Sequence, residues 1–195
     1  MDRSSCLRRL RPIRALVTLA AIGLVAAAAS GADGSVRVNS APPHVTVIGD
    51  SVLTAVLWYP EPLRILTNGL DVDMQIAVCR RLVGVSCPYE GGAASTLVDL
   101  VAAYGPKLGK TVIVEAGYNE PEAEFADAIE QSLAALRGAG VTQVLWLSLS
   151  TRRADLTRMN ATLAAAARRH PELTIVDWAD LTHGNDDWFQ GDGIH

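Results

Sequence analysis

Residues 45–51 read Val-Thr-Val-Ile-Gly-Asp-Ser, a short β-branched run that stops at a glycine. A run of this kind, bounded by a turn residue, predicts a buried strand over 45–48. The segment that follows, 51–58, predicts a short helix that is stopped by Pro60 and Pro62. A buried strand that passes directly into a helix is typical of a parallel sheet covered on both faces.

The same alternation of strands and helices continues along the chain. Further strands are expected over 72–78, 111–115, 141–149 and 173–176. Helices are expected between them, where apolar residues recur at a spacing of three or four, over 95–108, 121–136 and 155–169. The inner face of the helix over 121–136 is expected to consist of Phe125, Ala128, Ile129, Leu133 and Leu136. Five strands alternating with helices predict an α/β fold with a five-stranded parallel sheet.

The first 32 residues have the order of a secretory signal peptide. Five arginines precede an apolar run over 15–29, and small residues suited to cleavage follow it. The run is shorter than the roughly 20 residues that a membrane span usually needs. Cleavage and export to the cell-envelope exterior or the medium are therefore expected rather than an uncleaved anchor. Residues 33–43 are polar and end in two prolines, which is typical of a linker, so the folded domain is expected over 44–195.

Loss of this leader makes the chain more acidic. The leader holds five of the 17 basic residues and one of the 21 acidic residues, so 12 basic and 20 acidic residues remain and the net charge becomes −8. Proteins that bind nucleic acid carry a basic patch, and none is visible in this sequence. Nucleic acid is therefore not expected as a partner.

Cys79 and Cys87 are the two cysteines that lie outside the leader. In an oxidising compartment, an even pair this close in sequence predicts a local disulfide. Two free thiols, a metal site and a nucleophilic cysteine are the alternatives. A metal would need further ligands, and no histidine stands nearby in the sequence.

Three groups of polar residues follow predicted strands. Gly49-Asp50-Ser51 follows the first strand, Gly117-Tyr118-Asn119 follows the third, and Asp192-Gly193-Ile194-His195 follows the fifth. The carboxyl ends of parallel strands meet at one edge of a sheet, and this edge is where α/β proteins bind their ligands. We therefore expect the three groups to form a single site.

The residue types in these groups suit a serine nucleophile. A serine hydroxyl attacks when a neighbouring base takes its proton, and His195 is the candidate base for Ser51. Asp192 stands three residues before the histidine and would hold its Nδ1–H. Asn119 is a candidate donor to an oxyanion. The structural alternatives are a helix N-cap for Ser51, a turn residue for Asn119, and a polar C-terminal turn for Asp192 and His195.

The order of these motifs resembles that of the SGNH/GDSL hydrolase superfamily over 45–195. The likeness is greatest to small secreted bacterial members with a Gly-Tyr-Asn block and a tryptophan in the fourth strand, here Trp146. The resemblance implies a flavodoxin-like three-layer α/β/α sandwich and hydrolysis of a carboxylic ester through an acyl-serine. It also implies that no metal or organic cofactor is used.

The resemblance assigns a role to each site residue. Ser51 would be the nucleophile and an oxyanion donor, Asn119 a second oxyanion donor, and His195 the base with Asp192 as its partner. The family usually has aspartate where this chain has Glu120, which is expected to act as a helix-start residue. The family also places a glycine after the second strand to complete the oxyanion hole. Gly91 or Gly92 is expected to fill this role, and Gly84 is a further candidate.

Three expectations concern the substrate and the chain end. A small ester, a lipid or an acylated glycan is the expected substrate, while an O-acetyltransferase with the same triad or a non-catalytic carbohydrate-binding domain is the alternative function. Trp178 and Trp188 are expected to pack under the final loop rather than stack on a sugar. Relatives usually continue past the final histidine, so the domain is expected to lack its C-terminal end.

Overall fold

The structure is a computed structural model that describes residues 41–195. The expected signal peptide and residues 33–40 of the expected linker lie outside the described residues. The first strand begins at His44.

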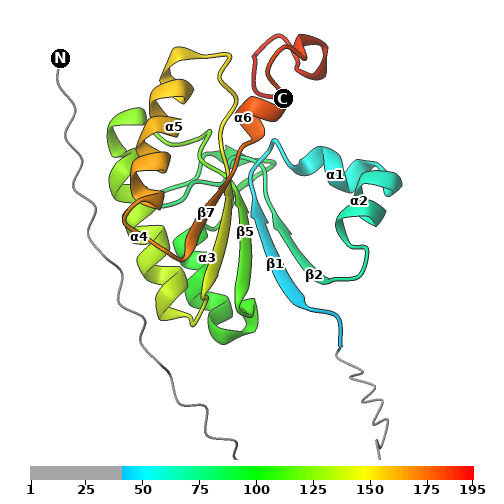
Figure 1. The fold of residues 1–195 in the computed structure, drawn as a ribbon, viewed down its shortest axis with the longest axis vertical. Coiled ribbons are helices and arrows are strands. Elements are labelled where there is room, and N and C mark those ends of the chain that lie inside the picture. Colours follow the sequence, from blue (N-terminus) through cyan, green and yellow to red (C-terminus); the bar gives the residue numbers. More distant parts are fainter. Residues whose placement is uncertain (1–40) are drawn as a thin grey trace, which may run out of the picture. The chain divides into compact units, whose positions relative to one another are not determined.

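Five parallel strands form one sheet in the order β2-β1-β5-β6-β7 (Figure 1). Their bounds are β1 His44–Gly49, β2 Asp71–Ile76, β5 Thr111–Glu115, β6 Gln143–Leu147 and β7 Leu173–Val176. Gly49 pairs with Ile76 on one side and with Glu115 on the other, so the three neighbouring strands end at the same level. The strand order reverses at β1 and β5, which is the flavodoxin-like arrangement. The predicted α/β fold with a five-stranded parallel sheet is confirmed.

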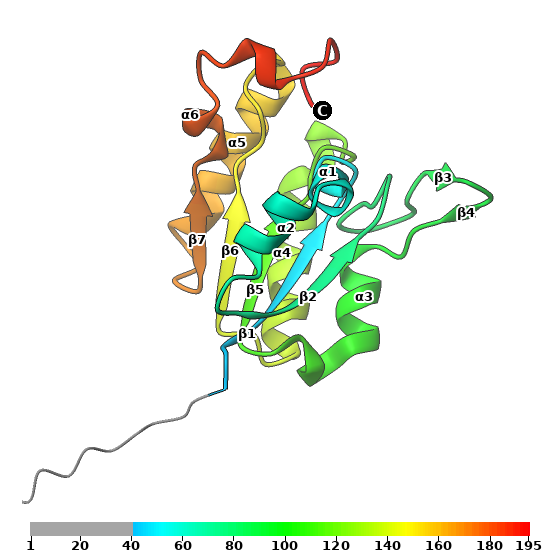
Figure 2. The ribbon, with the colours of Figure 1, turned by 90° about the vertical axis from the view of Figure 1, so that its right-hand side faces the viewer.

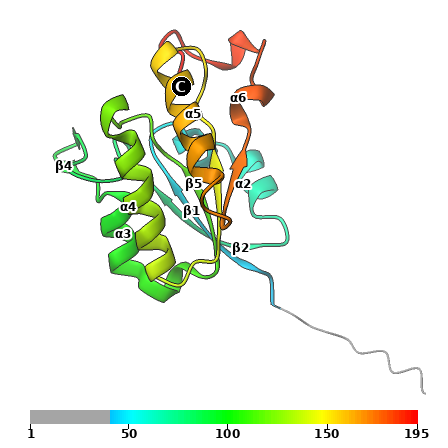
Figure 3. The same ribbon diagram turned by 60° about the vertical axis from the view of Figure 1, so that its left-hand side comes forward.

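Helices cover the sheet from both sides (Figure 3). One face carries α3 Leu97–Tyr104, α4 Phe125–Gly138 and α5 Ala154–Ala167, and the other carries α1 Thr54–Trp58 and α2 Pro60–Leu66. The short helix α6, Trp178–Leu181, lies beyond the carboxyl end of β7. Right-handed crossovers explain this division, because the chain moves in one direction along the sheet from β1 to β2 and in the other from β2 to β7. Within residues 41–195, the helices are too short or too polar to span a bilayer.

The core lies between the sheet and the longer helices. The inner face predicted for α4 is confirmed, since Phe125, Ala128, Ile129, Leu133 and Leu136 are all at most 1% exposed. Trp146 of β6 is also fully buried, and its indole N–H donates to the carbonyl of Ala116 at 3.1 Å. This bond satisfies the polar atom of a large core side chain.

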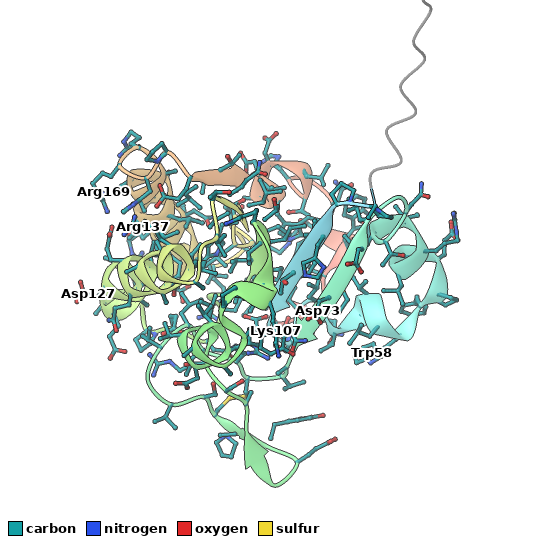
Figure 4. The ribbon with its side chains drawn as sticks, turned by 90° about the horizontal axis from the view of Figure 1, so that it is seen from below. Trp58, Asp73, Lys107, Asp127, Arg137 and Arg169 are labelled. Atoms are coloured by element: carbon teal, nitrogen blue, oxygen red, sulfur yellow. A yellow bond between two sulfur atoms is a disulfide. The ribbon has the colours of Figure 1, made fainter. Side chains whose placement is uncertain are left out.

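The structure differs from the sequence prediction at several places, and the helix expected over 51–58 begins only at Thr54. Pro60 was expected to stop the helix, and α1 does end before it, but a second helix, α2, begins at Pro60 itself. Proline is well suited to the first turn of a helix. After β2, the strands β3 Pro88–Tyr89 and β4 Gly92–Ala93 form a separate hairpin that stands away from the main sheet (Figure 2). The predicted disulfide between Cys79 and Cys87 is present and is the yellow bond near the base of this hairpin in Figure 4.

Candidate active site

The three polar groups converge at the carboxyl edge of the sheet. Ser51 lies in the turn between β1 and α1, and Asn119 lies in the loop after β5. The C-terminus returns to the same edge beside the start of α1 (Figures 1 and 2). The backbone N–H of Asp50 donates to the carbonyl of Glu115 at 3.0 Å, which extends the pairing of β1 and β5 up to the site.

Ser51, His195 and Asp192 form one chain of hydrogen bonds. His195 Nε2 lies 3.0 Å from Ser51 Oγ, and His195 Nδ1 lies 2.7 Å from Asp192 Oδ2. The other oxygen of Asp192 accepts the backbone N–H groups of Ile194 at 2.9 Å and His195 at 3.0 Å. The hydrogen bond from His195, helped by these N–H groups, lowers the pKa of Asp192 to about 2. The ionised carboxylate therefore holds a proton on Nδ1 and leaves Nε2 free to accept one.

The hydroxyl of Ser51 does not cap the following helix. The N-cap position of α1 is occupied by Leu53, without a side-chain capping bond. Ser51 uses its carbonyl instead, which accepts the backbone N–H of Thr54 at 3.2 Å and its hydroxyl at 2.6 Å. The side-chain oxygen of Ser51 is thus left to face His195.

Asn119 connects the loop after β5 with the ends of β1 and β2. Its Nδ2 donates to the carbonyl of Arg80 at 3.1 Å and lies 3.4 Å from Asp50 Oδ2. Asp50 immediately precedes Ser51, so this contact joins the loop of Asn119 to the segment that carries Ser51.

Gly91 and Gly92 are not placed beside Asn119. They lie at the turn of the β3–β4 hairpin, where a Cβ added to either glycine would meet nothing within 4 Å. The expectation that one of them completes the oxyanion hole is therefore corrected. The backbone in contact with Asn119 is that of Arg80, and the preceding residue Cys79 has the left-handed φ of +63° that favours glycine. A cysteine in that conformation carries no sequence signal, so the segment was missed.

Glu120 has a different role from the one expected. Its side chain is fully buried and lies 2.8 Å from the guanidinium of Arg81, and it also accepts the backbone N–H of Leu82. Glu120 thus ties the loop after β5 to the segment after β2, rather than acting at a helix start. Two adjacent arginines, Arg80 and Arg81, are the feature of the sequence that suggests a buried acidic partner. Glu120 lies 39 positions from Arg81, and no local pattern links the two.

The carboxyl groups of Asp50 and Glu115 are buried beneath the site. Burial raises the pKa of Asp50 to about 6, and burial together with the charge of Asp50 raises the pKa of Glu115 well above its usual range. Among the described residues, Oε2 of Glu115 has no hydrogen-bond partner. Two buried carboxylates this close repel each other, so the protonated form of Glu115 is favoured over the ionised form.

An apolar cavity of about 340 Å³ lies beside His195. Its lining includes Val56, Leu147, Trp178, Trp188 and Phe189. The rings of Trp178 and Phe189 are 6.5 Å apart, as expected for packing beneath the final loop. Trp188 departs from that expectation, because it is 55% exposed and faces the cavity.

The remaining histidines lie apart from the site. His183 is exposed on a loop, and His44 and His170 pair with carboxylates at 2.8 and 2.9 Å. Across residues 41–195, no group of three or more His, Cys, Asp or Glu side chains is placed to hold a metal ion.

The fold and the site together define a doubly wound α/β domain with a serine–histidine–aspartate arrangement at its carboxyl edge. Neither a protein-family model nor a curated protein matches the sequence. Among solved structures, the chain is similar to the N-terminal part of the protein BF1531 from Bacteroides fragilis, which contains a phosphatase domain and is complexed with Mg. The two share 12% identity and a TM-score of 0.43, over 77% of this chain and 45% of that chain. The chain therefore spans less than half of that structure, and a likeness of this degree does not bear on function.

Proposed function

We propose that this protein is a secreted serine esterase of the SGNH/GDSL type, which hydrolyses a carboxylic ester through an acyl-serine. The observation that carries the proposal is the chain of hydrogen bonds from Ser51 to His195 to Asp192, at 3.0 and 2.7 Å. The three motifs that resemble this superfamily supply all of these residues and Asn119. The disulfide supports an oxidising compartment, in agreement with the expected signal peptide.

In the first half of the reaction, Ser51 Oγ attacks the carbonyl carbon of the ester while His195 Nε2 takes its proton. The carbonyl π bond opens, and the resulting oxyanion accepts the backbone N–H of Ser51 and the Nδ2–H of Asn119 that gives up its 3.4 Å contact with Asp50. When the oxyanion re-forms the carbonyl, the bond to the alcohol oxygen breaks. His195 returns the proton to that oxygen, which leaves the acyl group on Ser51.

In the second half, water replaces the alcohol. His195 takes a proton from the water as its oxygen attacks the acyl carbon, and the bond to Ser51 Oγ then breaks as the proton is returned to it. Throughout both halves, the Asp192 carboxylate stabilises the imidazolium and keeps its ring oriented.

The test compares the full chain with its Ser51→Ala variant. The wild-type protein is expected to hydrolyse p-nitrophenyl acetate and butyrate and to be labelled by a fluorophosphonate probe, and Ser51→Ala is expected to lose both properties. Ser132→Ala is the matched control, because Ser132 is buried in α4, away from the site, and should retain both. Wild-type protein that is inert to both ester and probe, or that turns over p-nitrophenyl phosphate instead, would refute the proposal.

A further inference from the structure

Ser150 connects the two loops that carry Asn119 and His195. It is fully buried in the segment that follows β6. Its backbone N–H donates to Tyr118 Oη at 2.8 Å, and its hydroxyl donates to the carbonyl of Gly193 at 2.9 Å. One residue thus touches the neighbour of the oxyanion donor and the turn that holds the candidate base.

Tyr118 provides a firm support at the first of these contacts. Its ring is partly buried and packs against the hydrophobic core. Burial raises the pKa of Tyr118 above its ordinary value, so the hydroxyl stays neutral and accepts the N–H of Ser150 at any pH at which an esterase works. The position of Ser150 is therefore tied to the rigid part of the domain.

Gly193 is constrained at the second contact. It has a left-handed φ of +69°, and a Cβ added to it would lie 3.1 Å from the Cβ of Arg152. The turn from Asp192 to His195 therefore packs closely against the segment after β6, and its middle carbonyl points to the hydroxyl of Ser150. The same hydroxyl oxygen accepts the backbone N–H of Arg152 at 3.3 Å, which fixes its direction.

The side chain of Arg152 holds the same C-terminal loop further along. Its guanidinium pairs with Asp186, and its Cζ lies 4.3 Å above the ring of Phe189. Its Nη2 also lies 3.4 Å from the carbonyl oxygen of Thr182. These contacts secure residues 182–189, while Ser150 holds Gly193, two residues before His195.

The catalytic pair has little packing of its own to hold it. The side chains of His195 and Asp192 are 36% and 46% exposed, and their hydrogen bond joins residues three apart in one turn. That bond keeps the imidazole oriented relative to Asp192, but it does not fix the turn relative to Ser51. The hydrogen bond from Ser150 to Gly193 does so from within the protein, together with the packing of Ile194 against the core.

We propose that Ser150 is a positioning residue, whose hydroxyl sets the distance between His195 Nε2 and Ser51 Oγ by holding the carbonyl of Gly193. The proposal rests on the proposed esterase function. A misplacement of about 1 Å can cost about 10²-fold in rate. Substrate contacts are not altered, so the loss belongs in kcat and not in KM.

The first experiment compares Ser150→Ala with Ser132→Ala. Both serines are fully buried and both donate to a backbone carbonyl, at 2.9 and 2.7 Å, but Ser132 does so within α4. With rates normalised to folded protein by circular dichroism, Ser150→Ala is expected to lower kcat about 10- to 100-fold and to change KM less than about twofold. Ser150→Cys, which keeps a weak donor, should recover part of the loss. Equal kcat values for the two alanine variants would overturn the proposal.

The second experiment does not depend on activity. Hydrogen exchange of the backbone amides of residues 190–195 is expected to be faster in Ser150→Ala than in wild type and unchanged in Ser132→Ala. If the wild-type protein proves inert to ester and probe, the esterase function fails while this comparison still tests the connection. Unchanged exchange in Ser150→Ala refutes the proposal in either case, and so does faster exchange with wild-type kcat in an active enzyme.

Discussion

His195 Nε2 lies 3.0 Å from Ser51 Oγ, although the two residues are 144 positions apart in the sequence. The contact arises because β1 and β7 end at the same edge of a parallel sheet, and the chain after β7 turns back towards β1. A base at this distance can take the serine proton directly.

Replacing Asp192 by asparagine is expected to lower kcat by about 10⁴-fold with little change in KM. The neutral amide cannot hold the proton on His195 Nδ1 as the carboxylate does, so the wrong tautomer faces Ser51. Steady-state kinetics with p-nitrophenyl butyrate measures the effect. Asp187→Asn is the control, since Asp187 is an exposed acid of the same loop. A loss of less than tenfold in Asp192→Asn would show that this carboxylate does not serve His195.

Asn119→Ala is expected to lower kcat by about 10²- to 10³-fold, because one oxyanion donor is removed. The loss should appear in hydrolysis and in the rate of fluorophosphonate labelling, since both form a negatively charged oxygen at the same place. Asn68→Ala serves as the control, because Asn68 is exposed and follows α2 in the sequence. If Asn119→Ala is labelled at the wild-type rate, Asn119 does not donate to the oxyanion.

Glu120→Ala is expected to lower the free energy of unfolding by about 3 kcal/mol, because it leaves the guanidinium of Arg81 and the N–H of Leu82 without a buried partner. Glu124 binds the same arginine at 2.8 Å, but its side chain is 60% exposed. Glu124→Ala should therefore cost less than about 1 kcal/mol. Urea denaturation of the two variants measures the difference, and equal losses would contradict the structural role given to Glu120.

The free energy of unfolding should depend on pH because folding raises the pKa of Asp50. Its pKa rises from 3.8 to about 6 on folding, so its protonated form stabilises the folded state fully below about pH 4. That stabilisation is lost as the pH rises through about 6. Relative to Asp50→Asn, wild type should lose about 3 kcal/mol of unfolding free energy between pH 4 and pH 8, since each pKa unit corresponds to about 1.4 kcal/mol.

The measurement for Asp50 is urea unfolding across this pH range. Asp187→Asn is again the control, and its difference from wild type should not vary with pH in the same way. A difference between wild type and Asp50→Asn that is flat from pH 4 to pH 8 would show that Asp50 ionises normally in the folded protein.

Loss of the disulfide is expected to affect both stability and rate. Cys79 and Cys87 are eight positions apart, and a loop of this length is worth about 2.5 kcal/mol in the chain-entropy account. The double variant with serine at both positions should therefore unfold at lower urea. It should also have a lower kcat, because Cys79 precedes the carbonyl that holds Asn119. Unchanged kcat with lowered stability would limit the disulfide to a structural role.

Much of the fold was predictable because it depends on patterns between neighbours in the chain. The β-branched run at 45–48 and the apolar period along α4 correspond to a buried strand and a buried helix face in the structure. The disulfide was predictable for the same reason, since its two cysteines are close in sequence. Ser51 and His195 could be proposed as partners because both follow strands, and parallel strands end at one edge.

The contacts that complete the site lie at long range and left no local pattern. Glu120 reaches Leu82 across 38 positions, and Ser150 reaches Gly193 across 43. The place given to Gly91 and Gly92 was wrong because a loop's path cannot be read from its glycines, and the left-handed φ before Arg80 belongs to Cys79 rather than to a glycine.

The amino-acid order alone thus specifies the strands and the helices, because their apolar residues recur at a short period, and it gives the polar residues that follow the strands. The burial of Asp50 and Glu115, the contact of Asn119 with Arg80 and the support of His195 by Ser150 arise only in the folded protein. Their physical cause is packing: strand register and helix position bring together side chains whose distance in the sequence carries no information about their distance in space.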